Sequence, residues 1–269
     1  FQERPRDWGA LRTHALGWLI KAIFLPLMLT WLINWTANFG AIVRSDLTDP
    51  ANLFKCAFAF VIFFDLVGAS LGYVSTFKIF GTQIKSVQCL FVGWIAALIC
   101  YPPLNHLISV LVEKTDKTAW MQPLEAQPVL LVTVALVIIA LELVYVLATV
   151  AFGLHFSNLT HRGIITGGPY RWTKHPAYLA KNCFWWMMAL PVMVTSEVPI
   201  WIATCVAAIS LIYFVRAKSE EIHLRNDTVY RDYAEWIEEN GLFAPLNRLR
   251  RKIFAVSSIR PVTSRLAGR

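Results

Sequence analysis

Residues 129–152 read VLLVTVALVIIALELVYVLATVAF, and Glu142 is the single charged residue among them. A helix needs about 20 predominantly apolar residues to cross the hydrocarbon core of a bilayer. The stretch meets that requirement, so it predicts a transmembrane helix at about Val129–Phe152. Glu142 is then an acid placed inside the membrane, which is costly and usually faces a cavity or a partner.

The composition of the whole chain agrees with a membrane protein. The 269 residues are 57% hydrophobic and only 16% charged, and their mean hydropathy is +0.52. Soluble domains are closer to half apolar and a quarter charged. The five cysteines are scattered without a metal-ligand spacing, so we expect neither a metal site nor a disulfide framework.

Further apolar runs predict a polytopic bundle. Asp65 lies inside one of these runs, and another is interrupted by Pro102-Pro103 and Asn105-His106, where a helix should kink or break. The fold class we expect is therefore all-α, a transmembrane helical bundle with a C-terminal interfacial amphipathic helix. About six spans are expected, at residues 16–35, 53–73, 87–112, 129–152, 183–194 and 199–215.

Loop charges predict the orientation. Lys and Arg are in excess at the N-terminus, in 74–86, in 155–181 and after the last span, whereas the alternate loops lack that excess. By the positive-inside rule, both termini and the loop 155–181 should face the cytoplasm. The membrane is either a bacterial inner membrane or the endoplasmic reticulum, and the sequence does not separate the two.

The C-terminal region divides into an amphipathic helix and a basic tail. Apolar and aromatic residues recur at helical spacing over 229–237, and Gly241 is placed to end that helix. Such a helix should lie on the membrane or cap a site. The tail after it has seven basic residues and no acid, which indicates contact with anionic lipid rather than with nucleic acid.

Residues 168–178 read GPYRWTKHPAY and form a polar cluster between two apolar regions. Gly167-Gly168-Pro169 favours a turn. Pro176 suits the first turn of a helix, so His175 should lie at its N-cap. A helix N-terminus beside Lys174 and His175 attracts a carboxylate or a phosphate.

A second cluster follows the apolar hairpin. Arg216 precedes Glu220 by four residues, so the two can pair or face one cavity, and Glu221 is adjacent. An anion site and a carboxylate pair brought together suit a zwitterionic or nucleoside ligand. Taken singly, these residues also fit ordinary roles. Lysine and arginine near the membrane contact lipid phosphates, Glu220-Glu221 can be a solvated helix end, and Tyr170 and Tyr178 can belong to an aromatic belt.

The two clusters together resemble the isoprenylcysteine carboxyl methyltransferase family and the related phospholipid methyltransferases. The family signature is G-x-Y-x-x-x-R-H-P-x-Y, followed after a hairpin by E-E. The resemblance covers about residues 160–245. Lys174 stands where the motif has arginine, which keeps the charge but loses the bidentate fork.

The resemblance implies a pocket for S-adenosylmethionine, with S-adenosylhomocysteine as the product. His175 and Tyr178 would contact the methionine part, and Glu220 and Glu221 its amine or the ribose. Arg216 would orient the substrate carboxylate, so Arg216 and His175 are the catalytic candidates. The implied cofactor-binding set is Ile164, Ile165, Thr166, Gly168, Tyr170, Lys174, His175, Pro176, Tyr178, Glu220 and Glu221.

The chain would then divide into three parts. Residues 1–128 would form an N-terminal transmembrane region of three spans, 129–245 the methyltransferase core and 246–269 a basic cytoplasmic tail. The acceptor would be lipidic or hydrophobic, such as a prenylcysteine-type carboxylate. The sequence leaves open whether oxygen, nitrogen or sulfur is methylated, and it leaves the oligomeric state open.

Two alternatives compete with this interpretation. A sterol-type membrane reductase would use NADPH, but a dinucleotide needs more phosphate-binding charge than one helix end supplies. A transporter or lipid-binding protein would use Asp65, Glu142 and the interrupted third region. His106, after the proline pair, is either a substrate-channel residue or, in the interpretation we favour, a histidine whose polar atoms find partners at the helix break. Both acids could also have purely structural partners.

Overall fold

The computed structural model describes residues 7–105 and 118–257. The expected all-α bundle is confirmed, and one short antiparallel pair of strands accompanies it. The α-helices are α1 (Trp8–Val43), α2 (Pro50–Val74), α3 (Phe91–Leu98), α5 (Pro128–Phe152), α6 (Pro176–Thr195), α7 (Pro199–Leu224), α8 (Thr228–Asn240) and α9 (Ala244–Ser257). The short elements are the strands β1 (Ser86–Val87) and β2 (Thr160–His161) and the 3-10 helices η1 (Lys78–Phe80), η2 (Gln122–Leu124), η3 (Gly153–His155) and η4 (Gly168–Arg171).

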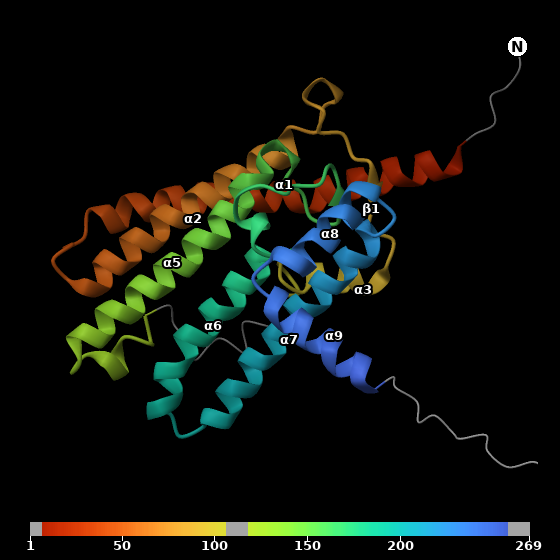
Figure 1. Cartoon of the computed structure of the whole chain (residues 1–269). Coiled ribbons are helices and arrows are strands. Elements are labelled where there is room, and N and C mark those ends of the chain that lie inside the picture. The colour runs from red at the N-terminus through yellow and green to blue at the C-terminus, as the bar shows by residue number, and fades with distance from the viewer. Residues whose placement is uncertain (1–6, 106–117, 258–269) are drawn as a thin grey trace, which may run out of the picture.

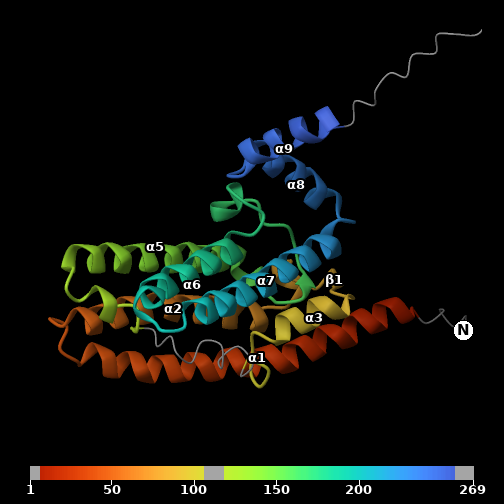
Figure 2. The ribbon, with the colours of Figure 1, turned by 90° about the horizontal axis from the view of Figure 1, so that it is seen from below.

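The long helices pack in series. α1 lies against α2, α2 against α5, α5 against α6 and α6 against α7, while α3 packs on α7 (Figure 1). Figure 2 shows α1, α2, α5 and α6 running roughly parallel to one another, with α8 and α9 standing off one side of the bundle. This arrangement places the ends of α5 and α7 beside the start of α6.

Proline begins four of these helices. Pro50, Pro128, Pro176 and Pro199 occupy the first turn of α2, α5, α6 and α7. Proline is favoured there because its fixed φ suits the helix and its missing N–H would have no partner anyway. The prolines therefore fix where these four helices start.

Four described helices, α1, α2, α5 with its 3-10 extension, and α7, are long and apolar enough to cross a membrane. Their large apolar side chains point outward as well as inward, and Val129 and Ile200 are each 82% exposed. Such surfaces suit contact with lipid. The protein is a multi-pass integral membrane protein, as the composition predicted.

The third expected span is not one continuous helix in the described residues. α3 ends at Leu98, before Pro102-Pro103, and turns follow through Asn105. The break that the prolines predicted is present, but it comes four residues earlier. His106 lies outside the described residues.

Arg162 fastens the loop after α5 to the end of α2. Its guanidinium donates to the carbonyls of Thr82 at 2.7 Å, Gly72 at 2.8 Å, Phe156 at 2.9 Å and Ser75 at 3.2 Å. The side chain is only 2% exposed, and burial lowers the pKa of Arg162 to about 10. The pairing of β1 with β2 holds the same loop from the other side.

α8 caps the end of the bundle with its apolar face. Tyr230, Tyr233 and Ile237 are buried on it, and the Tyr233 hydroxyl donates to the Tyr170 carbonyl at 2.8 Å. The sequence allowed this helix either to lie on the membrane or to cap a site, and the structure supports the second role. The helix ends before Gly241, as expected. The start of the predicted tail forms α9, and residues 258–269 lie outside the described residues.

Candidate active site

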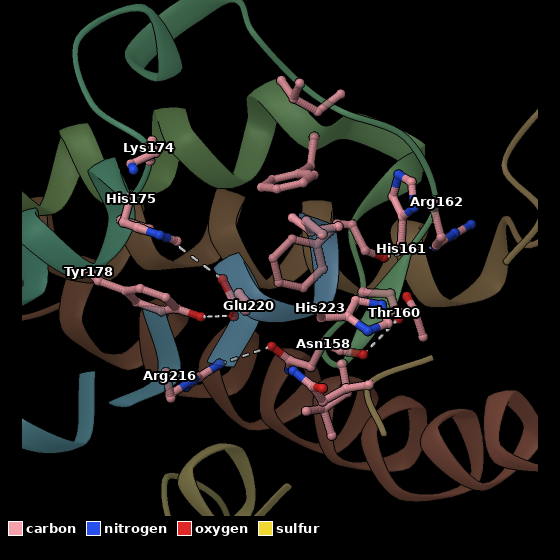
Figure 3. Close-up of a pocket in the computed structure, with 18 of the residues that line it drawn as sticks. Asn158, Thr160, His161, Arg162, Lys174, His175, Tyr178, Arg216, Glu220 and His223 are labelled. Carbon is pink, nitrogen blue, oxygen red and sulfur yellow. Dashed lines mark hydrogen bonds and ion pairs between the residues drawn. The ribbon is translucent and has the colours of Figure 1, made fainter. Parts of the chain in front are cut away.

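One large pocket lies where α5, α6, α7, α8 and the loop 153–167 meet (Figure 3). Its empty volume is about 1410 Å³, which includes the open space at its mouth. The residues that line it come from segments far apart in the sequence, from Gln88 to Tyr233.

The start of α6 is built by two turns that the sequence specifies. Gly168 has a φ of +58°, in the left-handed region that favours glycine, and it begins η4. Pro176 then begins α6, with His175 as its N-cap residue. The imidazole makes no capping hydrogen bond, so it is available to other partners.

His175 lies between the two glutamates of α7. Its Nε2 is 3.2 Å from Glu221 Oε1, and its Nδ1 is 3.8 Å from Glu220 Oε2. Glu221 also accepts from Lys218 at 2.8 Å and lies 3.9 Å from the Lys174 ammonium. The two clusters that are distant in sequence thus form one charged group at the mouth of the pocket.

Tyr178 connects this charged group to the interior. Its hydroxyl donates to Glu220, and its ring stacks on His175 and on Tyr213, each with ring centroids 5.7 Å apart. The Arg216 guanidinium lies over the same ring, 5.1 Å from its centroid. A cation over an aromatic face is stabilised by the ring quadrupole.

Asn158 holds Arg216 in place. Arg216 Nη2 donates to Asn158 Oδ1 at 3.2 Å, and Asn158 Nδ2 donates to the Tyr101 hydroxyl at 3.0 Å. Arg216 is only 8% exposed, and its position over Tyr178 is set from three elements of the fold. A fixed guanidinium facing a pocket can bind and aim an anionic group.

The other end of the pocket is more apolar. Ile164 and Ile165 line it and pack with Tyr230 and Tyr233. His161 also lines it, and its Nε2 is 3.5 Å from Asp227 Oδ2. Burial lowers the pKa of His161, and the Asp227 carboxylate partly opposes that shift. A neutral imidazole beside aliphatic and aromatic side chains suits a nucleobase.

Most of the residues predicted from sequence line this pocket, and the others lie around it. Ile164, Ile165, Tyr170, Lys174, His175, Tyr178, Arg216 and Glu220 are in its wall. Glu221 lines a smaller neighbouring hollow with Lys174 and reaches the pocket through His175. Thr166, Gly168 and Pro176 are outside the wall, where Gly168 and Pro176 shape the two turns.

Several lining residues were missed by sequence reasoning. Asn158, Tyr101 and Tyr145 come from segments that looked like loop or membrane span, and nothing in the sequence relates them to the motif. Lys181 was detectable, because it follows Tyr178 by three residues on one helix and so shares its face. The residues predicted on α6 therefore end about one turn before the last residue of that helix that lines the pocket.

An outward-facing apolar bundle with a pocket of mixed polar and apolar lining at one end defines a membrane protein with a candidate ligand site. Residues 125–226 match the model of the isoprenylcysteine carboxyl methyltransferase (ICMT) family. This part of the chain is therefore similar to the ICMT family, which confirms the resemblance seen in the motif. Searches among curated proteins and among solved structures found no match to the chain.

Proposed function

We propose that the protein transfers a methyl group from S-adenosylmethionine to a lipidic or hydrophobic acceptor. The observation that carries this proposal is the placement of His175, Tyr178, Glu220 and Arg216 in one pocket with Ile164 and Ile165. The match to the ICMT family supports methyl transfer. The cofactor and the acceptor are our inference.

The two ends of the pocket fit the two halves of S-adenosylmethionine. The cofactor has a zwitterionic amino acid at one end and a nucleoside at the other. Glu220 and His175 offer a carboxylate and an imidazole to the first, and the wall of Ile164, Ile165 and Tyr230 offers apolar surface to the second. The residues present therefore fit the group.

When bound, S-adenosylmethionine supplies an electrophilic methyl group. The residues of this chain would bind and orient, since transfer to a positioned nucleophile needs neither a metal nor a covalent enzyme intermediate. Holding two reactants in line can contribute roughly 7–11 kcal/mol to lowering the barrier. Arg216, fixed by Asn158 and Tyr178, would aim an anionic acceptor. For an amine or thiol acceptor, His175 would take the proton.

We also propose that the pocket opens on the cytoplasmic side and that the acceptor enters from the bilayer. The basic loops at this end support the orientation. Exposed Arg248, Arg250 and Lys252 on α9 support contact with anionic lipid headgroups.

Ligand-dependent thermal stability tests the proposal. The detergent-solubilised protein is heated with S-adenosylmethionine, S-adenosylhomocysteine or NADPH, because a ligand that binds the folded state raises the melting temperature. Either methyl-cycle ligand should raise it by several degrees at saturation. A shift with NADPH and none with the other two would instead support the reductase.

A further inference from the structure

The pocket continues deeper than the residues assigned above. Below Tyr178 and Arg216 its wall is formed by Tyr145 of α5, Lys181 of α6 and Tyr213 of α7. Lys181 is three residues beyond Tyr178, which places it roughly 4.5 Å further along the helix axis. A lysine at this depth belongs to the membrane-embedded part of the bundle.

Lys181 has an aromatic contact and two acids behind it. Its ammonium lies 3.9 Å from the centroid of the Tyr145 ring, and the Tyr145 hydroxyl donates to Asp65 Oδ2 at 2.7 Å. Asp65 and Glu142 interact electrostatically with Lys181. They are 8% and 4% exposed, and neither lines the pocket. Lys181 lines the pocket and both acids lie outside its wall, so the charged side chain in this part of the wall is the lysine and not a carboxylate.

The side of Lys181 that faces the cavity is available to a ligand. Within residues 7–105 and 118–257, the cation–π contact is accompanied by no hydrogen bond or ion pair to the ammonium. An ammonium has three donors, and a charged group inside a membrane protein that lines a cavity usually serves a ligand. The group that fits is an anionic oxygen.

We propose that Lys181 binds a carboxylate in the inner part of the pocket, about one helical turn beyond Tyr178 on α6. The inference rests on the proposed function, since it adds a binding residue to the same pocket. Two carboxylates can reach this depth: the headgroup of an amphiphilic acceptor and the amino acid end of the cofactor. Tyr145 and Asp65 are positioning residues that hold the ammonium toward the cavity.

The experiment compares Lys181→Met with wild type in the full-length solubilised protein, using two matched ligand pairs. Oleate and oleyl alcohol share one chain and differ in the carboxylate, and both are titrated as a mole fraction of the micelle. S-Adenosylhomocysteine is compared with its decarboxylated analogue. Affinity is read from thermal stabilisation. Lys55→Met is the control, because Lys55 is exposed on α2 away from the pocket.

Loss of affinity for one carboxylate ligand identifies its source. If Lys181→Met weakens oleate by about tenfold or more and leaves oleyl alcohol unchanged, the carboxylate belongs to the acceptor. If the variant instead loses about tenfold in affinity for S-adenosylhomocysteine alone, and its affinity for the decarboxylated analogue is unchanged, Lys181 binds the carboxylate of the cofactor. Unchanged affinity for both carboxylates overturns the proposal. Failure of wild type to bind S-adenosylhomocysteine would count against the proposed function, while the oleate pair would still test Lys181.

Removing the lysine leaves two buried acids without their cation, which can prevent folding. The double variant Lys181→Met, Asp65→Asn restores the charge balance and should show the same selective loss. Lys181→Arg keeps a cation and should retain the preference for the carboxylate. A purely structural lysine would give unfolded protein in the single variant and normal carboxylate affinity in the double variant, which also overturns the proposal.

Discussion

His175 and Arg216 contact different parts of one pocket, so their replacement should have different consequences. His175→Ala removes the imidazole between Glu220 and Glu221 and should weaken S-adenosylhomocysteine binding about tenfold, the loss expected for one charge-assisted hydrogen bond. Arg216→Ala should leave that affinity within about threefold and lower turnover about a hundredfold, because the acceptor is no longer aimed.

Binding is measured by thermal stabilisation, and turnover by transfer of labelled methyl groups into lipid extracted from membranes. Arg225→Ala is a matched control, since Arg225 is exposed just after α7. An Arg216 variant that loses as much cofactor affinity as the His175 variant would contradict this division of roles.

Arg162 has a structural role that its place in the pocket wall does not reveal. Four carbonyl oxygens accept from its guanidinium, and no single ammonium can reproduce that fork. Arg162→Lys should therefore destabilise the protein by about 2–5 kcal/mol, because buried carbonyls lose their donors.

The change is measured as a lower apparent melting temperature without ligand. Arg44→Lys is the control, because Arg44 is exposed in the loop between α1 and α2. Equal melting temperatures for the two variants would mean that the four hydrogen bonds of Arg162 do not stabilise the fold.

At the scale of elements, α8 reaches the site through a close backbone approach at Gly241. A Cβ on this residue would lie 2.6 Å from the Ile237 carbonyl oxygen and 2.8 Å from that of Trp172. The residue has an extended conformation with a φ of −76°, so close packing and not backbone strain requires glycine. The Leu242 amide donates to the same Trp172 carbonyl at 2.7 Å.

Gly241→Ala should displace α8 and cost about 1–3 kcal/mol, as overpacking typically does. It should also weaken cofactor binding, because Tyr230 and Tyr233 move with the helix. Gly167→Ala should be tolerated, since no atom lies within 4 Å of a Cβ at that position. Melting temperatures with and without S-adenosylhomocysteine measure both effects. Equal melting temperatures for the two variants, with and without the ligand, would show that Gly241 is not closely packed against the Ile237 and Trp172 carbonyls.

At the scale of the whole molecule, the bundle places the pocket at the end where α2, α5 and α7 finish and α6 begins. The loop charges predict that this end faces the cytoplasm. In a protein whose five cysteines are replaced by alanine, Gln83→Cys should react only with reagent on the cytoplasmic side. Leu47→Cys, in the loop between α1 and α2, should react only from the opposite side.

Intact vesicles and a thiol reagent that cannot cross the membrane provide the measurement. Both positions are exposed in the structure, so failure to react from one side reports topology and not burial. Labelling of Gln83→Cys from the outer side would invert the predicted orientation and place the pocket outside the cytoplasm.

The sequence by itself determined the membrane class, the start of α6 at Pro176, and the two polar clusters that meet at the pocket. These features depend on the hydropathy of continuous segments and on the spacing of residues close in sequence, and neither requires knowledge of the fold. The third apolar region shows the limit of hydropathy, because α3 ends at Leu98 although the apolar segment continues beyond it. Only the tertiary structure decided that Asn158 and Tyr101 hold Arg216 and that Glu221 contacts His175. It also decided that Lys181 and Tyr145 line the inner part of the pocket, with Asp65 bonded to Tyr145 outside the wall. These contacts join segments up to 80 positions apart, and helix packing sets them.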